Sequence, residues 1–287
     1  MTERKVGIVA ECVVDLPKEY LVKHDIPILY FTIEVDSGVF TDTDEVTAEN
    51  ILSYVKEGGK KAISSPSSIA TYEKMFRESL KKYRDVVFIS AGAGTSKSFS
   101  RACEAVKNLG NLGSNIHVVD SKLISSAEGL VLMRVVELAE KGASVEEIVK
   151  EVEAYREKIS ATFVVENADF LYRNGRVSAR VKNFCATFNL HPVLCMKRGC
   201  MALKSIMLGS YENASLRYVR NELCKANKID AKNVFLVHAG CTNKKIEQVR
   251  SEILKRIKPE NLYVVSASAS VSCNCGPGSF GVMFALK

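Results

Sequence analysis

Short apolar runs alternate with helical patterns through the first half of the chain, and this alternation restricts the possible folds more than any other feature. Four runs are rich in β-branched residues and bounded by turn residues, as strands are: residues 6–10, 28–35, 86–90 and 116–120. Apolar side chains at helical spacing predict helices at residues 69–83 and 125–141. Strands separated by helices in this way predict a parallel sheet with helices on both faces.

The pattern changes after residue 159. Strands are predicted at residues 161–165, 233–238, 261–266 and 281–286, with a hairpin formed by residues 192–196 and 201–207. Helices are predicted at residues 213–226 and 243–257. We therefore expect an α/β fold of two domains. Residues 1–158 form a mostly parallel sheet flanked by helices, and residues 159–287 form a mixed or antiparallel sheet packed by helices. A ligand would lie in the cleft between them.

Composition excludes several classes of protein. A chain of 287 residues, 47% apolar and 25% charged, can bury one large core or two modest ones, so it is neither a disordered tail nor a small disulfide scaffold. The net charge of +7 is spread over many segments. The densest basic stretch, residues 244–258, alternates in sign and contains no aromatic residue, so nucleic-acid binding is not expected.

No membrane span is predicted. The most apolar stretch, residues 129–139, contains Arg134 and Glu137 and falls short of the roughly 20 apolar residues that a spanning helix needs. The N-terminus runs from a charged tetrapeptide into an apolar segment without a small-residue cleavage site, which predicts a cytoplasmic protein.

The cysteines predict neither disulfides nor a metal site. Nine is an odd number, the chain is too large to need disulfide staples, and no C-x-x-C pair occurs. The nearest approach to a ligand set combines Cys273 and Cys275 with His238 and Cys241, without a recognised zinc spacing. We expect reduced thiols, no metal and no cofactor.

Two serine-rich segments could hold an anion. Residues 63–68 (ISSPSS) lead into a helix, so their hydroxyl and N–H groups form either an anion seat or an ordinary helix cap. Residues 90–98 (SAGAGTSKS) follow a strand and precede a helix, as a phosphate-binding loop does. Ala91 and Ser96 stand where that loop needs glycine, so a carboxylate is the easier ligand.

Two turns complete the candidate segments. Residues 275–278 (CGPG) form a rigid turn whose backbone can approach a ligand, and residues 174–176 (NGR) hold an arginine that is either solvated or an anion clamp. No conventional catalytic set can be assembled, because none of the four histidines has a partner at a recognised spacing. This favours holding a ligand over transforming one.

Taken in order, these segments resemble the DegV family. The matching segments, with the family patterns they resemble, are residues 8–17 (IVAECVVDLP, a strand with D-S-x-x-D-L-P), 64–67 (SSPS, T-S-Q-P-S), 96–99 (SKSF, S-G-T-Y), 118–121 (VVDS, V-x-D-S), 174–178 (NGRVS, G-G-R-I-S), 189–194 (NLHPVL, N-x-K-P-I-L) and 276–281 (GPGSFG, G-P-G-x-x-G). Members of that family bind fatty acids, and in several bacteria they are the acyl-carrying subunit of a fatty acid kinase. The resemblance implies two α/β domains, an acyl chain buried between or within them, and a carboxylate held by hydroxyls and a histidine.

Carried over position by position, the resemblance gives a set of candidate ligand-binding residues. Alignment on Pro66 places Ile63 where the family has its carboxylate-binding threonine, and Asn274 stands where it has histidine. The implied head-group residues are Ser64, Ser65, Ser96, Asn274, the Gly276 amide and the Arg176 side chain.

The predicted function is non-catalytic binding of a long-chain fatty acid or related lipid in a buried tunnel, with a fatty acid kinase subunit as a further partner. One alternative is that the interdomain cleft binds a small phosphorylated metabolite and performs hydrolysis or phosphoryl transfer. Another is a scaffold that binds no ligand. The sequence predicts no catalytic residue, and it leaves open the acyl chain length, the head group and the oligomeric state.

Overall fold

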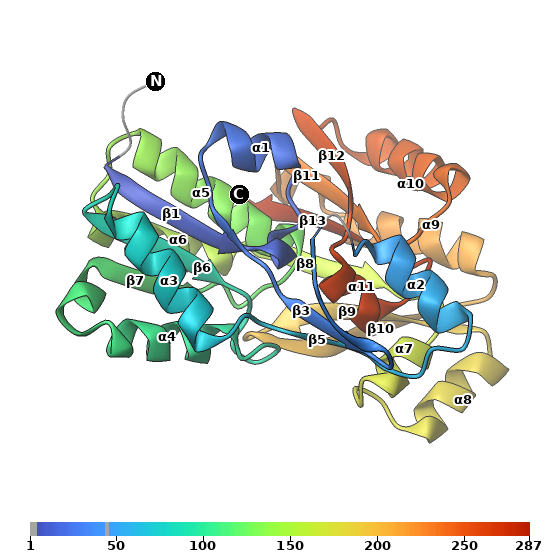
Figure 1. The fold of residues 1–287 in the computed structure, drawn as a ribbon. Coiled ribbons are helices and arrows are strands. Elements are labelled where there is room, and N and C mark those ends of the chain that lie inside the picture. The colour runs from blue at the N-terminus through green and yellow to red at the C-terminus, as the bar shows by residue number, and fades with distance from the viewer. Residues whose placement is uncertain (1–4, 44–45) are drawn as a thin grey trace.

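A four-stranded parallel sheet organises the first half of the molecule (Figure 1). The computed structural model describes residues 5–43 and 46–287. The strands lie in the order β2-β1-β6-β7, with β1 (Val6–Glu11), β2 (Ile28–Leu29), β6 (Asp85–Ser90) and β7 (Ile116–Asp120). Every neighbouring pair is parallel, as the sequence predicts.

Helices cover both faces of this sheet, which confirms the predicted arrangement (Figure 1). Val9 packs with α3 and α4, whereas its neighbours Ile8 and Ala10 pack with α5 and α6, because side chains alternate along a strand. The helices and 3-10 turns of this half are α1 (Lys18–Lys23), α2 (Ala48–Lys56), α3 (Ile69–Leu80), α4 (Ser98–Asn108), α5 (Ser126–Glu140), α6 (Val145–Arg156), η1 (Cys12–Val14) and η2 (Gly110–Asn115).

A six-stranded mixed sheet organises the second half, and this too is predicted. Its order is β10-β9-β8-β13-β11-β12, and only β11 and β12 are parallel neighbours. The strands are β8 (Ile159–Val164), β9 (Leu190–Lys197), β10 (Cys200–Leu208), β11 (Ile229–His238), β12 (Asn261–Ser266) and β13 (Phe280–Leu286). The other elements are α7 (Asp169–Arg173), α8 (Ala179–Thr187), α9 (Tyr211–Glu222), η3 (Ala226–Lys228), α10 (Asn243–Arg256) and α11 (Ala269–Cys275).

A third, antiparallel sheet has the order β4-β3-β5 and corrects one prediction. Its strands are β3 (Thr32–Val35), β4 (Gly38–Thr41) and β5 (Ala62–Ser65). The sequence predicts residues 28–35 as one strand, but they form β2 in the first sheet and β3 in the third. The ladder is interrupted at Phe31, whose N–H donates to the Cys12 sulfur and whose carbonyl accepts from the Asp42 N–H.

The two halves share hydrophobic packing. One core cluster joins Leu130 and Val131 of α5 to Phe235 of β11 and Met283 of β13. The predicted domain boundary at residue 158 lies between α6 and β8 and stays a prediction. Within residues 5–43 and 46–287, no helix is both long enough and apolar enough to cross a membrane.

Candidate functional site

Helix α11 carries Asn274, and buried carboxyl groups fix where this helix begins. Its sequence, ASVSCNC, has no apolar periodicity that would predict a helix. Asp42 accepts hydrogen bonds from the N–H groups of Ala269 at 3.2 Å and Ser270 at 2.8 Å, so these first amides have acceptors. Asp15 accepts from the N–H of Ser268 at 2.7 Å.

The helix ends at Gly276, which has a φ of +81°. A Cβ atom at this position would lie 2.6 Å from the Phe170 ring, so both the backbone conformation and the close approach require glycine. Because the N–H of Gly276 donates to the Ser272 carbonyl at 2.9 Å, the amide that the sequence assigns to the head group already has an acceptor.

Two of the predicted site residues, Ser64 and Asn274, lie in contact. The Asn274 amide nitrogen donates to the Ser64 hydroxyl at 3.1 Å and to the Ser270 carbonyl at 2.8 Å. Ser64 pairs with buried Ile33 on the face of β5 that packs against α11, whereas strand alternation places Ser65 on the opposite face. The segment that the sequence predicts as an anion seat is therefore partly a strand, and only one of its two candidate serines faces Asn274.

The structure does not join the other predicted residues to this pair. The Ser96 hydroxyl accepts from the Ser98 N–H at 3.1 Å at the start of α4. Arg176 lies in an exposed turn and lines a separate cleft of about 190 Å³ beside α8 and β10. Among the described residues, no hydrogen bond links Ser96 or Arg176 to Asn274.

Backbone amides of the loop at residues 90–98 already have acceptors within the protein. The Gly92 N–H donates to Leu123 at 2.7 Å, and the Ser96 N–H donates to the Gly92 carbonyl at 3.1 Å. The Ala93 N–H donates to the Asp120 carboxylate at 3.1 Å. A phosphate would have to displace these bonds and approach a carboxylate, so the loop is a poor phosphate cradle.

An apolar cavity of about 60 Å³ lies beside Asn274, at the end of the six-stranded sheet that faces α11. Its lining is mainly apolar, with Asn274, Ser125, Ser279 and His238 as the polar members. The apolar lining residues are Ile124, Phe163, Met201, Val237, Ala239, Ala267, Val271, Cys275, Phe280, Gly281 and Met283.

This apolar cavity is smaller than the predicted tunnel. A cavity of roughly 150 Å³ is needed to hold even benzene, so a long acyl chain requires the lining side chains to move. Met201 and Met283 suit such movement because methionine is unbranched and has three rotatable bonds.

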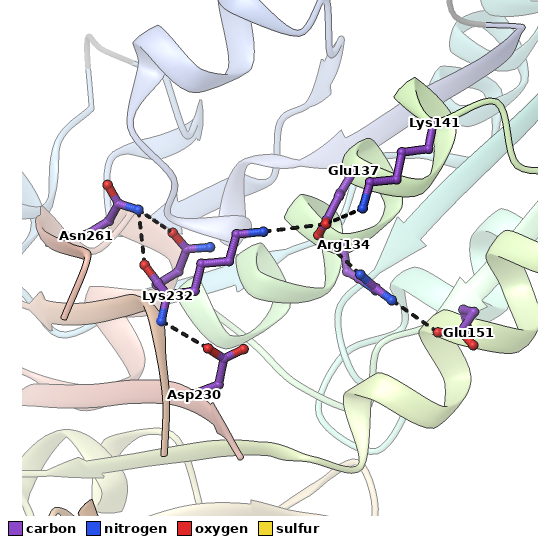
Figure 2. A network of polar contacts seen from close by, with 8 residues as sticks. Arg134, Glu137, Lys141, Glu151, Asp230, Lys232 and Asn261 are labelled. Atoms are coloured by element: carbon purple, nitrogen blue, oxygen red, sulfur yellow. Dashed lines mark hydrogen bonds and ion pairs between the residues drawn. The ribbon is translucent and has the colours of Figure 1, made fainter. Parts of the chain in front are cut away.

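Two larger clefts contain none of the predicted site residues. One of about 820 Å³ lies beside α1, α2 and α3, and charged residues such as Lys18 and Glu78 line it. Another of about 410 Å³ is lined by a charge network in which Glu137 pairs with Arg134, Lys141 and Lys232 (Figure 2). The small cavity suits an acyl ligand better because its lining is almost entirely apolar.

The sequence does not predict a set of buried carboxyl groups, of which Asp15 accepts from the hydroxyl of Ser125 in the cavity lining. Glu11 accepts from the Ser98 hydroxyl at 2.6 Å and from the Tyr72 hydroxyl, and burial raises the pKa of Glu11. Burial also raises the pKa of Asp15 to about 7. Glu128 is completely buried, neither of its oxygens has a hydrogen-bond partner among the described residues, and burial raises its pKa well above the ordinary value.

These carboxyl groups do not form a metal site. The described part of the chain contains no group of three or more histidine, cysteine or acidic side chains arranged to hold a metal ion. Position alone would be the sequence signal for two of the carboxyl groups. Glu11 is the last residue of a buried strand, and Glu128 lies inside an apolar helical stretch. Glutamates at such positions can also be exposed, so position alone does not predict that these two are buried.

Comparison with known proteins gives matches over nearly the whole chain. A family model described as "uncharacterised protein, DegV family" matches residues 5–287. A DegV domain-containing protein of Staphylococcus aureus is 23% identical over 281 residues, 98% of each chain. One from Caldanaerobacter subterraneus is 25% identical over 290 residues, 99% of each chain.

Solved structures share the fold. A DegV family protein from Thermus thermophilus, described by its fatty acid binding, has a TM-score of 0.87 at 23% identity, covering 98% of this chain and 100% of its own. The Streptococcus pneumoniae fatty acid kinase B3 protein loaded with linoleic acid has a TM-score of 0.82 at 20% identity, covering 99% and 100%.

Proposed function

This chain belongs to the DegV family, and from this premise we propose that it binds a long-chain fatty acid or a related lipid without transforming it chemically. The observation that carries the proposal is the apolar cavity with the Ser64–Asn274 pair beside it. Relatives of the same fold are described as binding fatty acids, including the linoleic acid-loaded protein of Streptococcus pneumoniae. The head group would lie at Asn274 and the acyl chain among the apolar side chains.

Burial of the acyl chain would supply most of the affinity. Each buried methylene contributes about 0.8 kcal/mol, whereas one net hydrogen bond contributes about 1 kcal/mol. The side chains that line the cavity must move apart to admit the acyl chain. The free energy that this rearrangement costs reduces the binding free energy gained from burial of the chain.

We assign the protein no catalytic role. A transferring or hydrolysing enzyme needs a nucleophile activated by an adjacent base. Among the described residues no hydrogen bond joins His238 to Ser125, Ser279 or Cys275, because these side chains donate to Asp15 and to backbone carbonyls instead. We further propose that the protein acts in the cytoplasm and presents its lipid to a kinase subunit, as the name of the Streptococcus pneumoniae relative suggests for that protein.

Extraction of the purified protein tests the proposal. Protein prepared without added lipid should release a long-chain acyl species into organic solvent, and mass spectrometry would identify it. Delipidated protein should gain thermal stability from acyl lipids and none from ATP. Failure to find any acyl species, together with no stabilisation by any acyl lipid, would contradict the proposal, and stabilisation by ATP would favour the phosphorylated-metabolite alternative.

A further inference from the structure

The hydrogen bonds of the Asn274 side chain to the described residues use its amide nitrogen and not its oxygen. The amide nitrogen carries two hydrogens, and its acceptors are the Ser64 hydroxyl at 3.1 Å and the Ser270 carbonyl at 2.8 Å, with the Cys273 sulfur at 3.5 Å. A carbonyl oxygen can only accept, so the atom beside Ser270 must be the nitrogen. The remaining hydrogen-bonding atom, Oδ1, can only accept, and Asn274 is one of the residues that line the apolar cavity.

The surroundings disfavour an anion at this position. No lysine or arginine is among the described residues that line the cavity, and burial lowers the pKa of His238, which disfavours its cationic form. Asn274 lies in the last turn of α11, at the negative end of the helix dipole.

Buried carboxyl groups of the protein further disfavour an anionic head group. Ser125, which lines the cavity, donates its hydroxyl to Asp15 at 2.5 Å, and Asp42 holds the other end of α11. Each of these carboxyl groups accepts from N–H and hydroxyl or thiol groups and has no cation among its hydrogen-bond partners in the described chain. A carboxylate buried near Asp15 at this end of the cavity would lack a countercharge, which is costly in a medium of low dielectric constant.

We propose that the head-group end of the cavity takes an uncharged acyl lipid that donates a hydrogen bond through a hydroxyl, such as a long-chain alcohol or a monoacylglycerol, in preference to an ionised fatty acid. This inference rests on the proposed function, because it names the head group of the same ligand. Asn274 accepts the hydroxyl hydrogen through Oδ1 and thereby determines the head-group specificity.

Three probes with the same acyl chain test the inference: oleyl alcohol, methyl oleate and oleate, each titrated into delipidated protein at about pH 8, where a carboxyl is ionised. Oleyl alcohol donates a hydrogen bond, methyl oleate only accepts, and oleate is charged. We expect oleyl alcohol to bind about fivefold more tightly than methyl oleate and at least about tenfold more tightly than oleate. Oleate binding as tightly as the alcohol would overturn the inference and leave the proposed function standing, whereas no binding by any probe would overturn both.

The Asn274→Leu variant distinguishes the contribution of the head-group contact from that of acyl-chain burial in the cavity. Leucine has a similar size but no acceptor, so the preference for oleyl alcohol over methyl oleate should disappear while the affinity for methyl oleate is kept. The control is Ser65→Ala, whose side chain faces away from α11; it should keep the full preference. An unchanged preference in Asn274→Leu would overturn the assignment, and the ranking of probes on the wild-type protein tests it even if this variant does not fold.

Discussion

The Asn274 amide donates to the Ser64 hydroxyl across 3.1 Å, although 210 positions of the sequence separate the two residues. The contact joins α11 of the second half to β5 of the third sheet. The candidate site therefore depends on how a short C-terminal helix packs against a small antiparallel sheet built from the first half.

Removal of the Ser64 hydroxyl should weaken this junction. Ser64→Ala deletes one acceptor of the Asn274 amide, and we expect a loss of about 0.5–1.5 kcal/mol in the free energy of unfolding. Urea denaturation measures it. Ser65→Ala is the matched control because it removes the same hydroxyl from the opposite face of β5, so its effect should be close to zero. Equal losses in the two variants would contradict this account of the junction.

Asp42 should contribute more to the stability of the protein than its position in a loop suggests. Its oxygens accept from the first two amides of α11, so Asp42→Ala leaves both donors without an acceptor and should cost about 1–3 kcal/mol. Asp42→Asn retains one acceptor oxygen and should lose less. Thermal denaturation of the two variants gives the comparison, and a smaller loss for alanine than for asparagine would argue against the capping role.

The architecture could be predicted from the sequence because it follows from local patterns. Runs of β-branched residues alternating with helical spacing predict the parallel sheet and its two helical layers, and α3 and α4 pack on one face while α5 and α6 pack on the other. Helix α11 and the break between β2 and β3 could not be predicted in this way. The start of α11 depends on the Asp42 carboxylate, which accepts from its first amides. The break depends on the Cys12 sulfur and the Asp42 backbone N–H, which bond to the backbone of Phe31.

The candidate site was predictable only in part, for a similar reason. Ser64 and Asn274 were identified through a family resemblance, and their contact is a property of tertiary packing. Strand alternation could have separated Ser64 from Ser65, but only if residues 62–65 were recognised as a strand. The buried carboxyl group of Glu128 has no such signal, because nothing in its helix distinguishes a buried from an exposed glutamate.

The buried Asp15 carboxyl should make stability depend on pH. Burial raises the pKa of Asp15 from 3.8 to about 7. The contribution of this group to folding stability is therefore fully present below about pH 4, where the carboxyl is protonated, and is lost as the pH rises through 7. Asp15→Asn keeps an acceptor for the Ser268 N–H and cannot ionise. Its Tm should therefore fall less than that of the wild type when the pH is raised from about 5 to about 8. Identical pH profiles would show that Asp15 does not titrate in this range.

The charge network around Glu137 links the two halves of the chain (Figure 2). Glu137 on α5 pairs with Lys232 of β11 at 3.5 Å, and its hydrogen bond to Lys141 and its other cationic partners lower its pKa to about 2. Because these side chains are partly exposed, Glu137→Gln should cost only about 0.5–1 kcal/mol, and less at high salt. A double-mutant cycle with Lys232→Met isolates the pair between the halves. No coupling at low salt would contradict a link through this pair.

Val271 provides a test of the apolar cavity itself. It projects from α11 into the lining, next to Asn274 in the same cavity, so Val271→Phe adds a ring where the acyl chain is proposed to lie. Binding of oleyl alcohol to delipidated protein should weaken by more than about tenfold, because the ring and the chain compete for one volume, while overpacking costs about 1–3 kcal/mol of stability. Val271→Ala removes volume at the same position and should retain binding, which separates a blocked cavity from a general effect of substitution. Titration calorimetry of both variants at matched fractions of folded protein measures the difference, and equal affinities would place the acyl chain elsewhere in the molecule.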